Sequence, residues 1–244
     1  MIELFGGNAP NVLKVVIALE ELNVEYRHIN FDIVNKKDDP DFRAVNPNGK
    51  VPAIIDTEGP GGAPMPLAES GAILFYLAEK YGAFFPTDPV KRYATMQWLM
   101  FQMSAIGPMF GQYVYFSRRV KNEQHGHDRY ATEVLRIYDV IETRLGKTRY
   151  IAEDEFTIAD MATFPPLHYV KVTGMDRSVY PNISRWMAEL AARPAIDRAI
   201  KSMGVIDLDA DMSSYNPTDD QWDRMFGRGK YSRAASLRTG NANA

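Results

Sequence analysis

The chain has 244 residues, of which 45% are hydrophobic and 24% are charged, and its formal net charge is -3. This composition is typical of a globular protein with one large domain or two modest ones, and the slight negative charge argues against nucleic acid as a partner. Cysteine is absent, so any thiol chemistry would need a bound thiol. No apolar run is long enough to span a bilayer and the first residues do not form a signal peptide, so we expect a cytoplasmic protein without membrane contact.

Strand-like and helix-like patterns alternate over the first 81 residues. IELF at 2–5 and YRHINF at 26–31 are typical of strands. Between them, the stretch from about Asn11 to Leu22 predicts a helix that begins beside Pro10 and carries Val12, Val15, Val16 and Leu19 at helical spacing. This order predicts a βαβ unit whose helix N-terminus follows the first strand.

A hairpin and a helix are predicted next. KVPAII at 50–55 indicates a strand, and the turn EGPGGAPMP leads to a short apolar segment before Glu69. A helix is predicted over 70–81, with Ser70 as its N-cap and Gly82 behind its end. Residues 84–89 have the character of a linker.

Helical patterns dominate from Val90 onward, and no strand is predicted there. Thr157 and Asp160 stand three apart, which predicts a capping box with Asp in place of Glu at the start of a helix. Pro165 and Pro166 are expected to kink that helix. We predict a first domain over 1–84, a helical domain over 90–204, and a polar tail over 205–244 that is partly disordered or laid across the surface.

Two short segments could recognise a ligand. Val51 and Pro52 open the predicted strand, where a cis peptide is one way to turn the chain. Glu69 and Ser70 combine a carboxylate, a hydroxyl and a helix N-terminus, which together suit the head group of an α-amino acid. Each segment also has a simpler interpretation: most X-Pro bonds are trans, and Glu69 and Ser70 could each be a helix cap.

Two longer motifs carry a family resemblance. NPNGKVPAI at 46–54 followed by ESGAILFYLAEKYG at 69–82 resembles the glutathione site of the cytosolic glutathione transferases, and TIADMATFP at 157–165 resembles a segment of their helical domain. APNVLKVVIALEEL at 9–22 and QWLMFQMSAIGPMFGQ at 97–112 resemble the nu class, which includes bacterial glutathione-dependent disulfide-bond reductases. The resemblance extends over roughly residues 1 to 200.

This resemblance implies a thioredoxin-like N-terminal domain, an all-helical C-terminal domain and a homodimer. It implies glutathione as cosubstrate, a small electrophile or disulfide as second substrate, and no tightly bound cofactor. The glutathione-binding residues that it implies are Lys37, Lys50, Val51, cis-Pro52, Glu69, Ser70 and, across the dimer, Arg129.

The residue that activates the thiol is implied to be Asn11. Members of the class have Thr-Pro-Asn near the thiol, whereas this chain has Ala9-Pro10-Asn11, which lacks the hydroxyl and retains the amide. A free thiol has a pKa near 8.5, and a helix N-terminus with an amide donor favours the thiolate. Lowering that pKa by about two units requires roughly 2.7 kcal/mol.

Two further sets of residues have competing interpretations. The stretch from Met96 to Phe116 could line an apolar substrate pocket, with Phe110 and Tyr113 as candidates, or it could be core or dimer interface. His125 and His127 flank a glycine without a nearby cysteine, which is typical of a solvated loop, so no metal site is predicted.

The predicted function is a glutathione-dependent transferase or disulfide-bond reductase that activates the glutathione thiol. A glutathione-dependent thioether lyase remains an alternative, because the same two-thiol geometry serves both reactions. A glutathione-binding regulatory protein without catalysis is the other alternative, since Ala9 removes one donor to sulfur.

Overall fold

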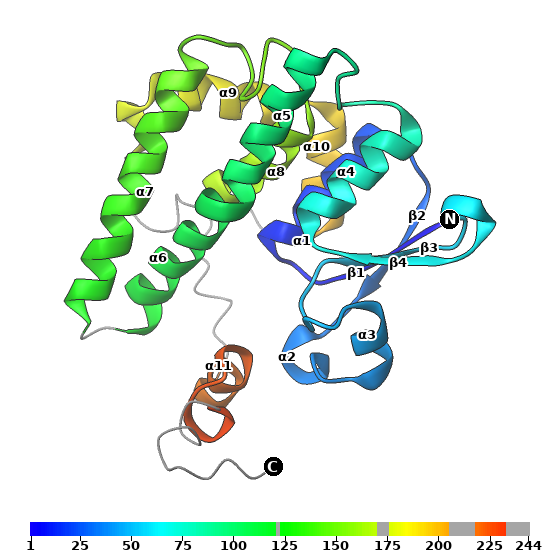
Figure 1. Cartoon of the computed structure of the whole chain (residues 1–244). Helices are drawn as coiled ribbons and strands as arrows, with labels where there is room; N and C mark the ends of the chain where they lie inside the picture. Colours follow the sequence, from blue (N-terminus) through cyan, green and yellow to red (C-terminus); the bar gives the residue numbers. More distant parts are fainter. Residues whose placement is uncertain (121–122, 170–175, 205–217, 233–244) are drawn as a thin grey trace.

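The computed structural model describes residues 1–120, 123–169, 176–204 and 218–232. A four-stranded sheet forms the centre of its first part, and the second part is a group of helices beside it (Figure 1). The sheet order is β2-β1-β3-β4, where β1 pairs parallel with β2 and antiparallel with β3, and β3 pairs antiparallel with β4. The strands are β1 (Ile2–Gly6), β2 (Tyr26–Asn30), β3 (Ala53–Asp56) and β4 (Met65–Ala68). This is the predicted thioredoxin-like arrangement.

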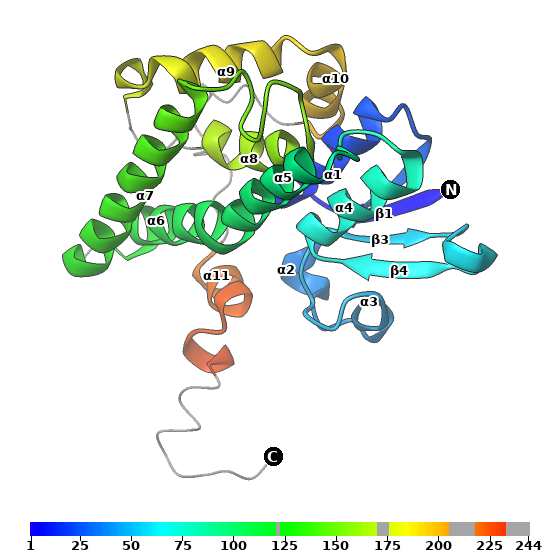
Figure 2. The same cartoon turned by 45° about the horizontal axis from the view of Figure 1, so that its top comes forward.

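Four α-helices belong to the first part. They are α1 (Pro10–Glu21), α2 (Ile33–Lys36), α3 (Pro40–Val45) and α4 (Ser70–Tyr81). Figure 2 shows α1 and α4 on the face of the sheet that meets the second part, with α2 and α3 on the opposite side. A short 3-10 turn, η1 (Pro60–Gly62), joins β3 to β4.

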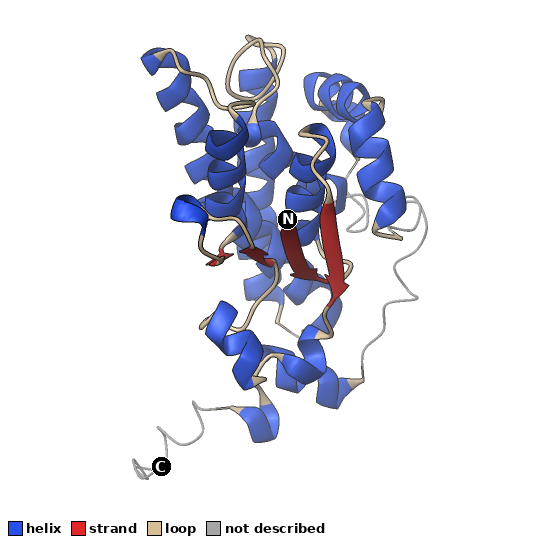
Figure 3. Cartoon of the chain, turned by 90° about the vertical axis from the view of Figure 1, so that its right-hand side faces the viewer, coloured by secondary structure: helices blue, strands red, loops and turns tan. Residues whose placement is uncertain are grey.

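Every regular element of the second part is helical in the residues described, and Figure 3 shows the strands confined to the first part. A π-helical segment, η2 (Gln102–Ile106), joins α5 (Pro89–Phe101) to α6 (Gly107–Arg119). The remaining elements are α7 (Gln124–Leu145), α8 (Ile158–Tyr169), η4 (Arg177–Val179), α9 (Pro181–Ala191), α10 (Pro194–Ser202), α11 (Asp219–Phe226) and η6 (Gly229–Tyr231).

Helix α1 is buried all round, because it lies between the sheet and the helical part. Every residue from Val12 to Leu19 is at most 1% exposed. The helix contacts α4 on its own side and α8 and α10 of the second part. The sequence predicted one apolar face, whereas the fold covers the whole middle of the helix, as is usual for a central helix.

The predicted capping box at the start of α8 is confirmed. The Asp160 carboxylate accepts from the Thr157 N–H at 3.0 Å, and the Thr157 hydroxyl accepts from Ala159 N–H at 3.3 Å. Asp160 also accepts from the Ile151 N–H and the Trp186 indole, both at 2.9 Å. Burial nevertheless raises the pKa of Asp160 to about 6. The helix continues through both prolines to Tyr169.

The strand predicted over 50–55 begins later in the structure. β3 starts at Ala53, directly after the cis peptide between Val51 and Pro52. Pro52 has no N–H to offer to a sheet ladder, and the carbonyl of Lys50 accepts from the Asn46 side chain instead of from a strand. Residues 50–52 therefore form a connection that leads into the strand.

The predicted polar tail contains a helix, α11, that the sequence pattern did not predict. Thr218 caps α11 through a capping box with Gln221, which satisfies the first backbone donors of the helix. The parts of the tail at 205–217 and 233–244 lie outside the described residues.

Candidate functional site

Three segments meet at one end of the sheet. Ala53, the first residue of β3, pairs with Phe5 near the end of β1 and with Ala68 at the end of β4. The loop from β1 into α1, the Val51–Pro52 segment and the start of α4 therefore come together, although they are far apart in the chain. The candidate site lies where this register brings the three segments together.

Helix α1 presents an uncapped N-terminus to this site. Its N-cap is Ala9, which provides no side-chain hydrogen bond, and its first turn contains no acidic residue. Pro10 occupies the first helical position and Asn11 is exposed beside it. The positive end of the helix dipole and the Asn11 amide are thus available to an anion.

The N-terminus of α4 supplies the second half of the site. Glu69 is exposed at φ 69°, a left-handed conformation that is uncommon outside glycine and that clusters at ligand-binding sites. Its carbonyl accepts the first helical bond, from Ile73, so Glu69 is the N-cap. The prediction that Ser70 is the N-cap is therefore wrong by one residue. Ser70 is buried as the first residue of the helix.

The connection before β3 supplies the third segment. Val51 is half-buried, Pro52 is buried and Lys50 is exposed. The Val51 peptide group precedes β3 and lies outside the pairing of that strand with β1 and β4. Backbone groups at such a position can pair with a bound peptide.

Two predicted binding residues have other partners in the chain. Lys37 is the C-cap residue of α2, and its ammonium donates to the carbonyl oxygen of Arg224 in α11. Arg129 lies on α7 and forms an ion pair with Glu133 at 2.8 Å. Lys37 is thus engaged by the C-terminal helix, and Arg129 lies in the helical part with a partner one turn away.

The predicted pocket residues lie in the packed interior. Phe110 is 4% exposed and stacks on Tyr138 of α7, with ring centroids 5.6 Å apart. Tyr113 is 8% exposed and its ring lies 5.5 Å from that of His127. The burial of both rings favours the interpretation as core residues, and their role in a pocket stays a prediction.

A buried lysine that was not predicted from the sequence lies behind the site. Lys14 of α1 is 1% exposed, and its ammonium donates to the Gln102 side chain of η2 at 2.8 Å. The next residue, Met103, places its sulfur 3.9 Å from the Ser70 hydroxyl. A lysine inside the apolar run NVLKVVIAL was the signal, because lysine is almost never fully buried without a partner.

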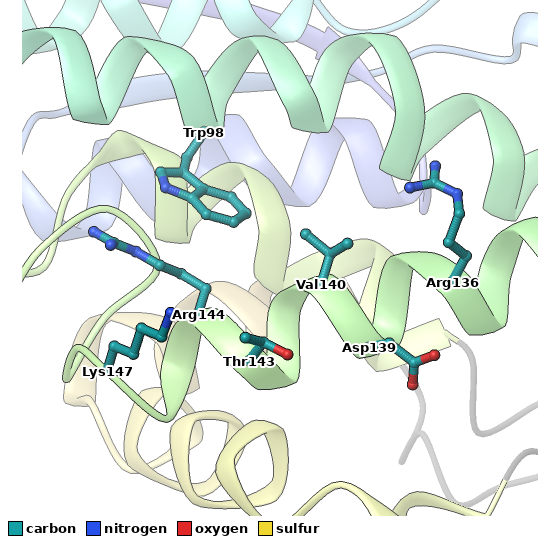
Figure 4. Close-up of a pocket in the computed structure, with 7 residues that line it drawn as sticks. All are labelled: Trp98, Arg136, Asp139, Val140, Thr143, Arg144 and Lys147. Atoms are coloured by element: carbon teal, nitrogen blue, oxygen red, sulfur yellow. The ribbon is translucent and has the colours of Figure 1, made fainter.

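A separate surface pocket lies between α5 and α7 (Figure 4). Its volume is about 430 Å³, and none of its lining residues belongs to the site described above. The lining residues are Trp98, Arg136, Asp139, Val140, Thr143, Arg144 and Lys147.

Within the described ranges, no three His, Cys, Asp or Glu side chains are placed together to hold a metal ion. Among the helices of those ranges, none has the length and apolar character needed to cross a membrane.

Comparison with known proteins identifies the relatives of this chain. Residues 2–79 match the model of the glutathione S-transferase N-terminal domain, and residues 124–189 match that of the C-terminal domain. The chain is 36% identical over 203 residues to the disulfide-bond oxidoreductase YfcG of Escherichia coli strain K12, covering 82% of this chain and 94% of YfcG.

Two similar solved structures contain glutathione species. A glutathione transferase family member from Pseudomonas fluorescens Pf-5, with two glutathione bound, has a TM-score of 0.77, 38% identity and coverage of 82% of this chain and 92% of that one. A glutathione transferase from Pseudomonas putida, with one glutathione disulfide bound per subunit, has a TM-score of 0.76, 39% identity and coverage of 82% and 90%. With both domain models matched in order on the observed fold, the chain belongs to the glutathione S-transferase family.

Proposed function

We propose that this protein binds glutathione as a thiolate and uses it to reduce disulfide bonds, with transfer of glutathione to electrophiles as a related reaction. The observation that carries this proposal is the meeting of the uncapped α1 N-terminus, the cis Val51–Pro52 segment and the Glu69–Ser70 start of α4. The similarity to a disulfide-bond oxidoreductase supports the reductase reaction over transfer alone.

Each end of glutathione has a candidate partner in this arrangement. Glu69 would pair with the γ-glutamyl ammonium, and the Ser70 hydroxyl with the α4 N-terminus would hold its carboxylate. The Val51 backbone would pair with the cysteinyl part beside Pro52. Asn11 would donate to the sulfur at the dipole of α1.

Cations would hold the glycine carboxylate of glutathione. Lys50 is exposed beside Val51 and is free to take this role without rearrangement. Lys37 would first have to leave the Arg224 carbonyl. Arg129 would act from the partner subunit, and Phe110 and Tyr113 would shape the second-substrate pocket from the core.

The proposed chemistry needs two glutathione molecules. The bound thiolate attacks one sulfur of the substrate disulfide, which forms a mixed disulfide and releases the other sulfur as a thiolate that takes a proton. A second glutathione thiolate then attacks the mixed disulfide, yielding glutathione disulfide and the second substrate thiol. The chain has no cysteine, so the second thiol must come from solution.

We also propose that the active form is a homodimer. Helices α5 and α7, which line the pocket of Figure 4, expose large apolar side chains. Exposed apolar surface is a feature of protein interfaces. The exposed residues are Val90, Tyr93, Met100, Leu135 and Val140.

We assign the chain to the nu class and to the cytoplasm. The Ala9-Pro10-Asn11 segment at the start of α1 supports the class, although it differs from Thr-Pro-Asn at its first residue. A cytoplasmic location supplies the reduced glutathione that the reaction consumes.

Turnover of glutathione with hydroxyethyl disulfide, compared with a chloronitrobenzene electrophile and an uncatalysed control, tests the function. Disulfide turnover well above the control supports the reductase. Turnover of the electrophile alone would replace reduction by transfer as the main reaction. If the protein binds glutathione but turns over neither substrate, the proposal is contradicted and a lyase or a regulatory protein is favoured.

A further inference from the structure

Lys14 is buried where a charged side chain lowers the stability of the fold. Its side chain is fully buried in α1, and its one hydrogen bond within the described residues goes to a neutral amide, Gln102 Oε1. The Nε2 atom of the same amide has no hydrogen-bond partner among the described residues. A buried ammonium without a carboxylate in contact destabilises a fold, and replacing it by an apolar side chain would be favourable. The site is therefore not arranged for stability.

The position of Lys14 connects it to both halves of the glutathione site. It lies one helical turn from Asn11, a spacing at which side chains are neighbours. Its partner Gln102 precedes Met103, whose sulfur packs on Ser70, and a Cβ on Gly71 would meet that sulfur at 2.9 Å. The π-helix thus links Lys14 to the start of α4, as such segments often do at functional sites.

Burial lowers the pKa of Lys14 to about 7, and the negative charge of Glu69 opposes this shift. The Lys14 amine can therefore gain or lose its proton near neutral pH. The other titratable or charged groups on elements around α1 have partners of their own: Asp160 with Trp186, His168 with Phe164, Arg193 with Glu21, Arg198 with Glu20, Lys201 with Asp197, Lys80 and Tyr76 with Asp56, Glu79 with Arg92, and Glu3 with Arg27.

We propose that Lys14 is the buried counter-charge of the glutathione thiolate, taking up a proton when the thiolate binds and stabilising that anion from inside the protein. This inference rests on the proposed function. The thiol proton leaves to solvent and Lys14 takes one from solvent, so binding releases less than one proton. Lys14 does not touch the sulfur; its charge acts through a medium of low dielectric, where charges are felt strongly.

The proton count tests this assignment directly. Glutathione binding is measured by calorimetry near neutral pH in buffers of different ionisation enthalpy, for the wild-type protein and for Lys14→Met. The wild type should release fewer protons than Lys14→Met, because only the wild type takes one up. S-methylglutathione has the same ammonium, which offsets the Glu69 charge, but it has no thiol and forms no thiolate. With this ligand the pKa of Lys14 should fall and not rise. The wild type should therefore release more protons than Lys14→Met.

Thiolate absorbance gives a second readout. Below the pKa of the bound thiol, Lys14→Met should hold roughly 3- to 30-fold less thiolate than the wild type at the same pH. Lys14→Arg retains the charge and should restore the thiolate, an outcome that a purely structural role would not produce. Equal thiolate titration and equal proton release in folded Lys14→Met would overturn the inference.

The two proposals can fail separately. A wild-type protein that does not bind glutathione refutes the proposed site. If the wild type binds and turns over glutathione, and Lys14→Met shows the same thiolate titration and proton release, only the role of Lys14 is refuted. If Lys14→Met does not fold, proton release by the wild type tests the inference. Release of one whole proton per glutathione bound, with the bound thiol fully ionised, would overturn it.

Discussion

The ammonium of Lys37 donates to the backbone carbonyl of Arg224, which ties α2 to α11 across 187 residues of sequence. Arg224 returns a bond from its guanidinium to the Asn35 carbonyl at 3.0 Å. On the other side, the Phe226 ring lies 4.9 Å from that of Tyr115 on α6. Helix α11 therefore bridges the two parts of the molecule (Figure 1). It also holds the ammonium of Lys37, which is predicted to bind glutathione.

Ending the chain at Gly204 should release Lys37. The freed ammonium can then meet the glycine carboxylate, and we expect the KM for glutathione to fall by roughly three- to tenfold, which corresponds to the net free energy of one typical hydrogen bond. Initial-rate kinetics measure the change. Lys37→Ala should abolish the gain in the shortened protein and have little effect in the full chain. The same KM in all four proteins would show that Lys37 does not bind glutathione.

Replacing Asn11 should affect turnover more than binding. Asn11→Ala removes the amide donor to the sulfur, so kcat should fall roughly 10- to 100-fold while KM for glutathione changes by about twofold or less. Asn11→Asp places a negative charge near the thiolate and should be slower still. Steady-state rates at saturating glutathione give the order. An Asp variant as fast as the wild type would exclude the proposed contact with sulfur.

Glu69→Gln should weaken glutathione binding. The substitution keeps the shape of the side chain and removes the charge that would pair with the γ-glutamyl ammonium, so KM should rise roughly 10-fold or more with a smaller change in kcat. Glu79→Gln is the matched control, because Glu79 lies on the same helix and pairs with Arg92 on the surface. A similar KM in both variants would contradict the role given to Glu69.

Lys14→Met should stabilise the fold in a pH-dependent way. The pKa of Lys14 is about 7 in the folded protein and 10.5 for the free side chain, so between these values the unfolded state binds more protons and wild-type stability rises with pH. The gain from Lys14→Met is therefore largest below pH 7, up to about 5 kcal/mol, and shrinks toward pH 10.5.

Urea unfolding at about pH 6 and about pH 9 measures this difference. Lys36→Met serves as the control, because it makes the same substitution at an exposed lysine. A gain from Lys14→Met that does not depend on pH would mean that Lys14 titrates normally.

Much of the fold was predictable because its signals are local. The strand and helix patterns before Gly82, the helical character after Val90 and the Thr157–Asp160 capping box each depend on residues close in sequence, where propensity and spacing act directly. The family motifs added the cis peptide before Pro52, which the structure contains. The small errors lie at boundaries, at Ser70 and at the start of β3, where one residue decides the hydrogen bonding.

The sequence by itself determined the family, the order of elements and the candidate residues Asn11, Glu69 and Ser70. Only the tertiary structure decided that Lys14 is buried against Gln102 and that Lys37 is held by Arg224. The physical reason is that these two contacts join residues 88 and 187 positions apart, so no local pattern encodes them. The environment of a lysine depends on how deeply it is buried and on which groups it contacts. Both are decided only when the two parts of the chain pack together.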